Sequence, residues 1–87
     1  MIISGVVRDE HSNPVPGASV YVVDAPAALP DIALLTDGDG RFALSAPVAG
    51  RYTIEANAGI GTPARGTVEV GDGAIEIELR FSGPPDG

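Results

Sequence analysis

The sequence predicts an all-β domain, a seven-stranded antiparallel β-sandwich with Greek-key connections. Three observations predict this class. Short runs of alternating apolar and polar residues recur along the chain, clusters of Gly, Pro, Asn and Asp separate them, and no stretch has the length and period of a stable helix. Short strands with regularly spaced turns are typical of two antiparallel sheets packed face to face.

Seven strands are expected along the 87 residues. They are Ile2–Asp9, Ala18–Val23, Ile32–Thr36, Arg41–Ala46, Arg51–Ala58, Ala64–Val70 and Ala74–Phe81. In the last strand every second residue from Ile75 to Phe81 is large and apolar, and the residues between them are charged. A strand this regular has one buried face and one solvated face.

A proline-containing turn separates the first two strands. Ile3, Gly5 and Val7 share one face of the first strand, and a glycine inside a strand indicates a bulge or the close approach of another backbone. The segment Asp9–Gly17 contains two prolines, which a central strand excludes, and several other turn formers.

A long loop follows the second strand. Pro26 and Pro30 interrupt Asp24–Asp31, and the span is too short for a stable helix. The third strand then leads into the glycine-rich turn Asp37–Gly40. The fourth strand is expected to direct Phe42 and Leu44 inward, and Pro47–Gly50 is expected to turn the chain into the fifth.

The second half repeats the alternation of strand and turn. Tyr52 lies on the inward face of the fifth strand, and Gly59–Pro63 is a loop. Gly71–Gly73 is predicted to be a second hairpin turn. We expect one domain over residues 1–81, followed by Ser82–Gly87 as a flexible tail or linker.

Composition excludes several classes of function. The chain has no cysteine, so disulfides and Cys-based metal sites are excluded. It has no lysine, which excludes Schiff-base chemistry and lysine-donated cross-links. The formal net charge is −7, and the five arginines, which are Arg8, Arg41, Arg51, Arg65 and Arg80, are scattered along the chain. We therefore expect neither nucleic acid nor anionic membrane as a partner.

The sequence does not identify a compartment. No apolar run approaches the roughly 20 residues of a membrane span. Met1 leads almost directly into an apolar strand, so no signal peptide is predicted. The chain either remains in the cytoplasm or is a piece of something longer.

Four motifs in order resemble a known family. They are Gly5-x-Val7-x-Asp9, Pro14-Val15-Pro16-Gly17-Ala18-x-Val20-x-Val22, Thr36-Asp37-x-x-Gly40-x-Phe42-x-Leu44 and Gly50-x-Tyr52-x-Ile54. Together they resemble the carboxypeptidase regulatory-like domain over residues 3–81. This is a small transthyretin-like sandwich found beside the catalytic domain of some metallocarboxypeptidases and widely as a bacterial extracellular module.

The resemblance implies a prealbumin-like Greek-key sandwich and a non-catalytic accessory role. Such a module supports, spaces or docks another domain or protein, so the implied partner is a neighbouring domain or subunit. In a longer protein it would be secreted, periplasmic or on the cell surface. The chain departs from the family at Gly59-Ile60, where an aromatic residue often stands, and in the proline-rich Asp24–Asp31 loop. We expect contact through this loop or by strand addition at an exposed sheet edge.

Two related sandwich classes fit the sequence less well. Transthyretin-like hydrolases of the urate pathway need several active-site histidines and a signature C-terminus, whereas this chain has one histidine and a Pro-Pro tail. Pilin- and adhesin-type modules that cross-link themselves use a lysine, which is absent here.

The aspartate pair in the glycine-rich turn could suggest calcium. An EF-hand loop needs Asp-x-Asp-x-Asp-Gly with a later Glu, and with Gly40 as the loop glycine the first and last ligand positions fall on Leu35 and Ala46. Neither side chain can bind. We therefore interpret the stretch as a hairpin turn in which the glycine takes the left-handed conformation. A weak calcium site formed by Asp37, Asp39 and another loop's carboxylate remains the alternative.

His11 is the only histidine, and it is interpreted as a solvated loop residue. A zinc site would have to use the adjacent Asp9 and Glu10, and adjacent residues of a strand point to opposite faces. A Ser-His-Asp triad would combine His11 with one of the serines, none of which sits in a nucleophile elbow. The serines considered are Ser4, Ser12, Ser19 and Ser45.

The remaining polar motifs also have structural interpretations. Glu76 and Glu78 resemble paired carboxylates but fit the polar side of a strand. Gly59-x-Gly61 and Gly71-x-Gly73 are not phosphate loops, because no helix follows either and no lysine is near. Tyr21 could stack on a sugar, although one tyrosine without a tryptophan offers little surface for carbohydrate binding.

We assign no catalytic, cofactor-binding or metal-binding residue. The leading hypothesis is the non-enzymatic accessory module. A carbohydrate- or calcium-binding module is the alternative, and a small hydrolase ranks third.

Overall fold

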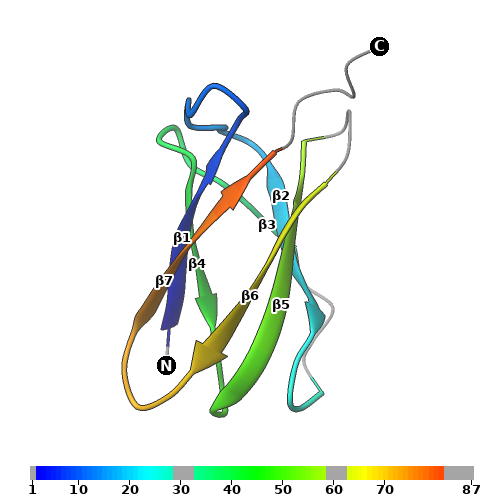
Figure 1. The fold of residues 1–87 in the computed structure, drawn as a ribbon, viewed down its shortest axis with the longest axis vertical. Coiled ribbons are helices and arrows are strands. Elements are labelled where there is room, and N and C mark those ends of the chain that lie inside the picture. Colours follow the sequence, from blue (N-terminus) through cyan, green and yellow to red (C-terminus); the bar gives the residue numbers. More distant parts are fainter. Residues whose placement is uncertain (1, 29–32, 59–62, 82–87) are drawn as a thin grey trace.

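A computed structural model describes residues 2–28, 33–58 and 63–81, which form two packed β-sheets (Figure 1). The seven strands are β1 (Ile2–Arg8), β2 (Ser19–Asp24), β3 (Leu34–Leu35), β4 (Arg41–Ser45), β5 (Gly50–Asn57), β6 (Ala64–Val70) and β7 (Ile75–Arg80). One sheet has the order β4-β1-β7 and the other β3-β2-β5-β6. No described segment forms a helix that is long and apolar enough to cross a membrane.

The predicted fold class, an all-β seven-stranded Greek-key sandwich, is confirmed. Hairpins join β2 to β3 and β5 to β6 within the four-stranded sheet, and the other connections pass between the sheets. The turns Asp37–Gly40 and Gly71–Gly73 are therefore not hairpin turns as predicted, because each leads from one sheet to the other.

One strand pair departs from the antiparallel arrangement that the sequence predicted. β1 and β7 are parallel neighbours, whereas the other pairings between strands are antiparallel. Because β7 reaches β1 from the opposite sheet rather than through a hairpin, nothing local forces an antiparallel direction.

The strand limits differ most at β3. Only Leu34 and Leu35 pair with β2, through Val20 and Ser19, so the observed strand is shorter than predicted. Ile32, where the predicted strand began, lies outside the described residues. A register shift between Val22 and Asp24 marks a β-bulge that ends regular pairing of β2.

The core lies between the sheets and follows the predicted alternation. Phe42, Leu44 and Tyr52 point inward and are buried, as the sequence predicted. The largest fully buried side chains are Tyr52, Ile3, Ile54, Leu79, Val7 and Val20. The hydroxyl of Tyr52 donates a hydrogen bond of 2.6 Å to the carbonyl oxygen of Val48, four residues earlier, so its polar tip is satisfied at the core boundary.

Two glycines allow close approach inside the sandwich. A Cβ at Gly5 would lie 2.6 Å from the carbonyl oxygen of Ile77 and would also collide with the ring of Phe42. This confirms the interpretation of Gly5 as a site of close packing. A Cβ at Gly66 would lie 2.8 Å from side-chain atoms of both Ile77 and Leu79, so this glycine lets β7 rest directly on β6.

Gly40 ends the turn before β4 and sits against two other backbones. Its φ is +73°, the left-handed conformation that the sequence predicted. A Cβ here would lie 2.8 Å from the carbonyl oxygen of Val7 and 2.9 Å from the nitrogen of Val15. The N–H of Val7 donates to the carbonyl oxygen of Gly40 at 2.7 Å. Any side chain would break this backbone contact.

Gly40→Ala is therefore expected to lower the free energy of unfolding by about 2–5 kcal/mol, the sum of left-handed strain and overpacking. Gly38→Ala is the matched control in the same turn, because a Cβ there meets nothing within 4 Å. Urea unfolding followed by tyrosine fluorescence or circular dichroism measures both variants. Equal stability of the two variants would contradict the left-handed, closely packed position assigned to Gly40.

Candidate functional site

The turn that contains the aspartate pair is built by Asp37 itself. Oδ1 of Asp37 accepts hydrogen bonds from the backbone N–H groups of Asp39 and Arg41, each at 2.9 Å. The backbone N–H of Asp37 donates to the carbonyl oxygen of Arg41 at 3.0 Å. The hydrogen bonds from Arg41 and then Asp39 lower the pKa of the Asp37 carboxyl below its ordinary value. This geometry assigns Asp37 to shaping the turn.

The calcium alternative required a third carboxylate beside Asp37 and Asp39. Within residues 2–28, 33–58 and 63–81, no three or more His, Cys, Asp or Glu side chains gather in a way that could hold a metal ion. One oxygen of Asp37 is already used by two backbone donors.

Thr36, the first residue of the third family motif, has a structural role that the sequence analysis did not assign. It is buried, and its Oγ1 accepts the N–H of Ala18 at 2.9 Å and donates to the carbonyl oxygen of Val15 at 2.6 Å. Its backbone is bound on the same side, to Ala18 and Gly17. Thr36 thus fastens the proline-containing loop to the turn before β4. Threonine is common in strands, so its place in the family motif beside Asp37 was the signal available in the sequence.

A second aspartate shapes the loop that carries the histidine. Oδ1 of Asp9 accepts the backbone N–H groups of Asn13 at 2.9 Å and His11 at 2.8 Å, and the bonds from Asn13 and then His11 lower the pKa of Asp9. The His11 side chain is 75% exposed, and its Nε2 lies 3.5 Å from Oε1 of Glu10. His11 is therefore a solvated loop residue in this structure, as the sequence predicted.

The serines considered for a catalytic triad lie on different elements. Ser12 follows the histidine in the loop and has a φ of 70°. Ser4, Ser19 and Ser45 lie on β1, β2 and β4 respectively. Asp9, the neighbouring carboxylate, uses its Oδ1 for backbone donors. The described structure therefore does not assemble the triad that the sequence left open.

The outer face of the four-stranded sheet carries a cross-strand polar cluster. The hydroxyl of Tyr21 on β2 donates to Oε1 of Glu55 on β5 at 2.5 Å, and Nη2 of Arg65 on β6 lies 2.6 Å from Oε2 of the same carboxylate. The bond from Tyr21, followed by that from Arg65, lowers the pKa of Glu55, and the same carboxylate raises the pKa of Tyr21. Tyr21 is half-buried and its hydroxyl is engaged, so this side chain ties strands together.

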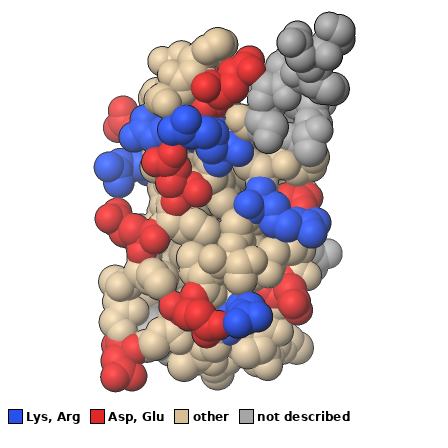
Figure 2. Space-filling view, in the orientation of Figure 1, with Lys and Arg blue, Asp and Glu red and all other residues tan. Residues whose placement is uncertain are grey.

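The outer face of the three-stranded sheet gathers arginines that are distant in the sequence. Arg8 on β1 lies opposite Arg80 on β7, and Arg41 on β4 lies opposite Val6. Oε1 of Glu78 lies 3.5 Å from Nε of Arg8, and its Oε2 lies 3.2 Å from Nη2 of Arg80. Figure 2 shows basic and acidic side chains next to one another. Three of the five arginines thus share this face, which is mixed in sign, whereas Arg51 and Arg65 lie on β5 and β6 of the other sheet.

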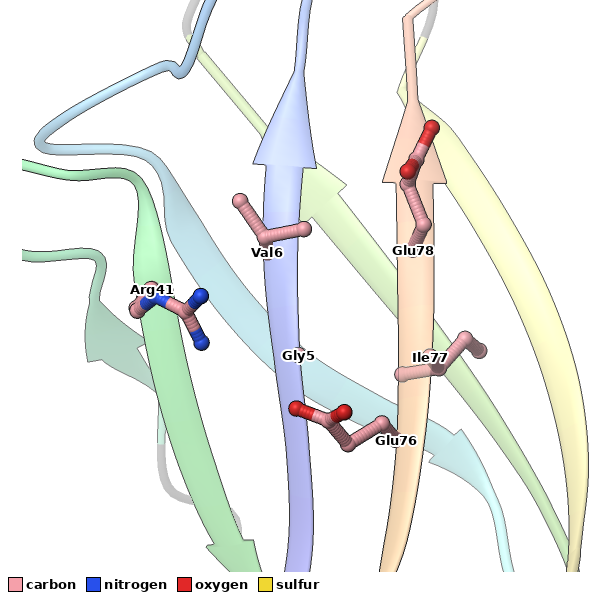
Figure 3. A pocket seen from close by; sticks show the side chains of 6 residues that line it. All are labelled: Gly5, Val6, Arg41, Glu76, Ile77 and Glu78. Carbon is pink, nitrogen blue, oxygen red and sulfur yellow. The ribbon is translucent and has the colours of Figure 1, made fainter.

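An open pocket of about 250 Å³ lies on the same face (Figure 3). It is lined by Gly5, Val6, Arg41, Glu76, Ile77 and Glu78. Figure 3 shows Arg41 and Glu76 on opposite sides of β1, both directed toward it. Glu78 is held by two guanidinium groups, so it is an ion-pair partner and not a free general base. Both glutamates lie on the polar side of their strand, as predicted.

A second open groove, of about 380 Å³, lies between the edge strands β3 and β4. It is lined by Ser4, Leu34, Leu35, Asp37, Arg41, Phe42 and Ala43. Leu35 is 69% exposed. Since the carbonyl oxygen of Gly40 faces β1, the alternation of an antiparallel ladder directs the backbone groups of Ala43 away from β1, toward the free edge. Strand addition at this edge stays a prediction.

Several predicted features fall partly or wholly outside the described residues. Gly59-x-Gly61, the tail Ser82–Gly87 and residues 29–32 of the Asp24–Asp31 loop belong to this group. In the described part of that loop, Pro26 lies so close to Gly50 that a Cβ on the glycine would be 2.8 Å from it. The loop therefore begins packed against the start of β5.

The fold and the turn geometry define a small transthyretin-like sandwich module. The chain belongs to the carboxypeptidase regulatory-like domain family, which matches residues 2–81. The resemblance found in the four sequence motifs is thereby confirmed. A comparison with curated proteins found no significant match.

Solved structures share this fold at low sequence identity. A DUF3823 family protein from Parabacteroides merdae has a TM-score of 0.69 at 17% identity, over 93% of this chain and 45% of that chain. The 5-hydroxyisourate hydrolase of Klebsiella pneumoniae has a TM-score of 0.66 at 20% identity, over 94% and 91%. BcpA, the major pilin subunit of Bacillus cereus, has a TM-score of 0.59 at 19% identity, over 93% and 30%. Identities this low establish a common fold only.

Thr36→Val is expected to lower the free energy of unfolding by about 1–3 kcal/mol, because it leaves the Ala18 N–H and the Val15 carbonyl without their buried partner. Thr36→Ser keeps the hydroxyl and loses one methyl group, so a loss of about 1 kcal/mol is expected. Urea titration of both variants measures the difference. If serine were as damaging as valine, the methyl group and not the hydrogen bonds would stabilise this site.

The lowered pKa values of Asp9 and Asp37 predict acid sensitivity. Each folded-state pKa lies below the ordinary value of 3.8, so each carboxylate stabilises the fold above that pH and loses this effect as the pH falls through the folded pKa. Asp37→Asn keeps an accepting oxygen but cannot titrate, so stability should depend less on pH below about 4. Asp37→Ala should lose stability at every pH. Urea midpoints measured between neutral and acidic pH test this prediction. It would be contradicted if Asp37→Asn lost as much stability at acidic pH as the original protein.

Proposed function

We propose that this chain is a non-catalytic accessory module that spaces and docks the neighbouring domains of a longer protein. The observation that carries the proposal is the position of the two ends of the sandwich. β1 begins at one end of the long axis and β7 finishes at the other (Figure 1). The molecule measures 41 × 23 × 19 Å along its principal axes. Domains joined to the two ends would be held apart along the long axis.

The use of polar side chains supports a structural role. Asp9, Asp37 and Thr36 hold turns through backbone hydrogen bonds, and the hydroxyl of Tyr52 caps its own upstream turn. Glu55 joins three strands through Tyr21 and Arg65. Family membership supports the same role, because the regulatory-like domain is an accessory unit.

A protein partner fits the surface better than the other classes considered. The net charge of −7 disfavours nucleic acid and anionic membranes. A sugar platform would rest on Tyr21, whose hydroxyl is already bound by Glu55. Docking is proposed at the free edge of β4 or through the loop after β2. The sequence predicted this loop and an exposed sheet edge without naming the strand.

The hydrolase alternative has one observation in its favour, the fold shared with a 5-hydroxyisourate hydrolase. The only histidine of this chain, His11, is exposed in a loop beside Glu10. Incubation of the purified chain with 5-hydroxyisourate is expected to leave the uncatalysed rate unchanged. Acceleration that is lost in His11→Ala would overturn the non-catalytic assignment.

The spacing role is tested by placing the chain between a fluorescent donor domain and an acceptor domain. A rigid spacer should give one narrow distance distribution in single-molecule energy transfer. The matched control replaces the chain with an unstructured Gly/Ser linker of equal length, whose mean span of about 50 Å is similar but whose distribution is broad. A distribution as broad as that of the linker would contradict the proposal.

A further inference from the structure

The first and last strands of the sandwich are direct neighbours that run in the same direction. β1 and β7 pair in parallel over six consecutive positions, from Ile3 opposite Ile75 to Arg8 opposite Arg80. The N–H of Phe81 donates to the carbonyl oxygen of Arg8 at 2.9 Å, which extends the ladder beyond the end of β7. The ladder is therefore continuous along almost the whole length of β1.

A parallel terminal pair has a particular response to tension. The beginning of β1 and the end of β7 lie at opposite ends of the pair (Figure 1). Pulling these two points apart slides one strand along the other, across the direction of the interstrand hydrogen bonds. All the bonds of the ladder then carry the load together. If the same strands were antiparallel, the pull would act at one end and open the bonds one after another.

We propose that the β1–β7 pair is a mechanical clamp that keeps the domain folded under tension applied between its two ends. This is a property beyond spacing and docking. Its use by the protein rests on the proposed function as an in-line spacer, whereas the clamp itself is a property of the isolated domain.

Side-chain packing adds resistance to sliding. On the inner side, the side chains of Ile77 and Leu79 pack against the backbone of Gly66 on β6. A shift of β7 along its axis would break both contacts. The outer side holds an ion pair between Arg8 of β1 and Glu78 of β7. Both contacts oppose the same displacement as the backbone ladder.

The partner strand of the clamp is itself anchored. β1 is the central strand of its sheet and pairs with β4 over five further positions, from Ile2 to Val6. β7 is an edge strand of the same sheet. The resistance to tension is therefore set by the release of β7 from β1, and the rest of the sheet holds β1 in place.

The clamp works without a covalent bond. With no cysteine and no lysine in the chain, neither a disulfide nor a lysine-derived amide cross-link can supply the resistance. Non-covalent rungs re-form when the strands meet again. A domain of this kind should unfold at high force and refold after release.

The decisive experiment compares two directions of pulling on the same fold in single-molecule force spectroscopy. In the first, handles are attached to the two ends of the chain. In the second, one handle stays at the N-terminal end and the other is attached through Asp72→Cys, a unique thiol in an exposed turn just before β7. Because β1 and β7 begin at the same end of the pair, the second geometry opens the ladder from that end. The end-to-end unfolding force should be several-fold higher, and equal forces would overturn the clamp.

Neighbouring proline variants test the rungs themselves. Since the N–H of Phe81 points to β1, alternation along β7 directs the N–H of Ile77 to β1 and that of Glu76 away from it. Ile77→Pro removes a rung and should lower the end-to-end force several-fold, whereas Glu76→Pro removes an N–H that faces away from the ladder and serves as the control, since it also leaves the Arg8–Glu78 ion pair in place. Equal effects of the two variants would contradict the clamp. If Ile77→Pro does not fold, the comparison of pulling directions on the Asp72→Cys chain decides alone.

The outcomes separate the clamp from the spacer. Equal forces in the two geometries together with a narrow energy-transfer distribution overturn the clamp and leave the spacer standing. A high end-to-end force together with a broad distribution overturns the spacer, because the clamp is then a property without that use.

Discussion

The structure depends on a close backbone contact among three segments, where Gly40 meets Val7 and Val15. The chain must cross from the four-stranded to the three-stranded sheet at this point, and its backbone polar groups need partners while it does so. The left-handed φ of Gly40 and its missing side chain let its carbonyl oxygen reach the N–H of Val7. Thr36 binds Val15 and Ala18 from the same crossing. The position of Phe42 in the core follows from this geometry.

Local chemistry explains which parts of this arrangement the sequence could predict. Gly40 and Asp37 were interpretable because a turn requires their particular properties, and alternation alone placed Phe42 and Tyr52 inward. Other features arise only when distant segments meet. Thr36 became a bridge because Val15 and Ala18 lie beside it in space. The turn at Gly71–Gly73 resembled a hairpin because a sequence does not show that its two strands join different sheets.

The candidate sites also divide into features that local chemistry predicts and features that arise only when distant segments meet. His11 and the aspartates attracted attention because their side chains can do chemistry, yet the aspartates are used to hold backbone turns. The mixed-charge face formed by Arg8, Arg80 and Glu78 was not predicted, since pairing between β1 and β7 creates it. Residue types alone therefore indicated possible chemistry, whereas strand order decided which groups meet. This is why family membership and end positions, more than any single residue, direct the functional proposal.

The β1–β7 pair illustrates why such a property has no sequence motif. Any residue except proline can supply a rung of a parallel ladder, so the backbone pairing of β7 does not depend on which side chains it carries. What matters is that the chain starts and finishes on adjacent strands with the same direction, and this is fixed by the crossings between sheets. Two of these crossings are made by the glycine-containing turns Asp37–Gly40 and Gly71–Gly73. The specialised residues of this domain thus act at its turns, and resistance to tension would arise from ordinary strand residues that the turns bring together.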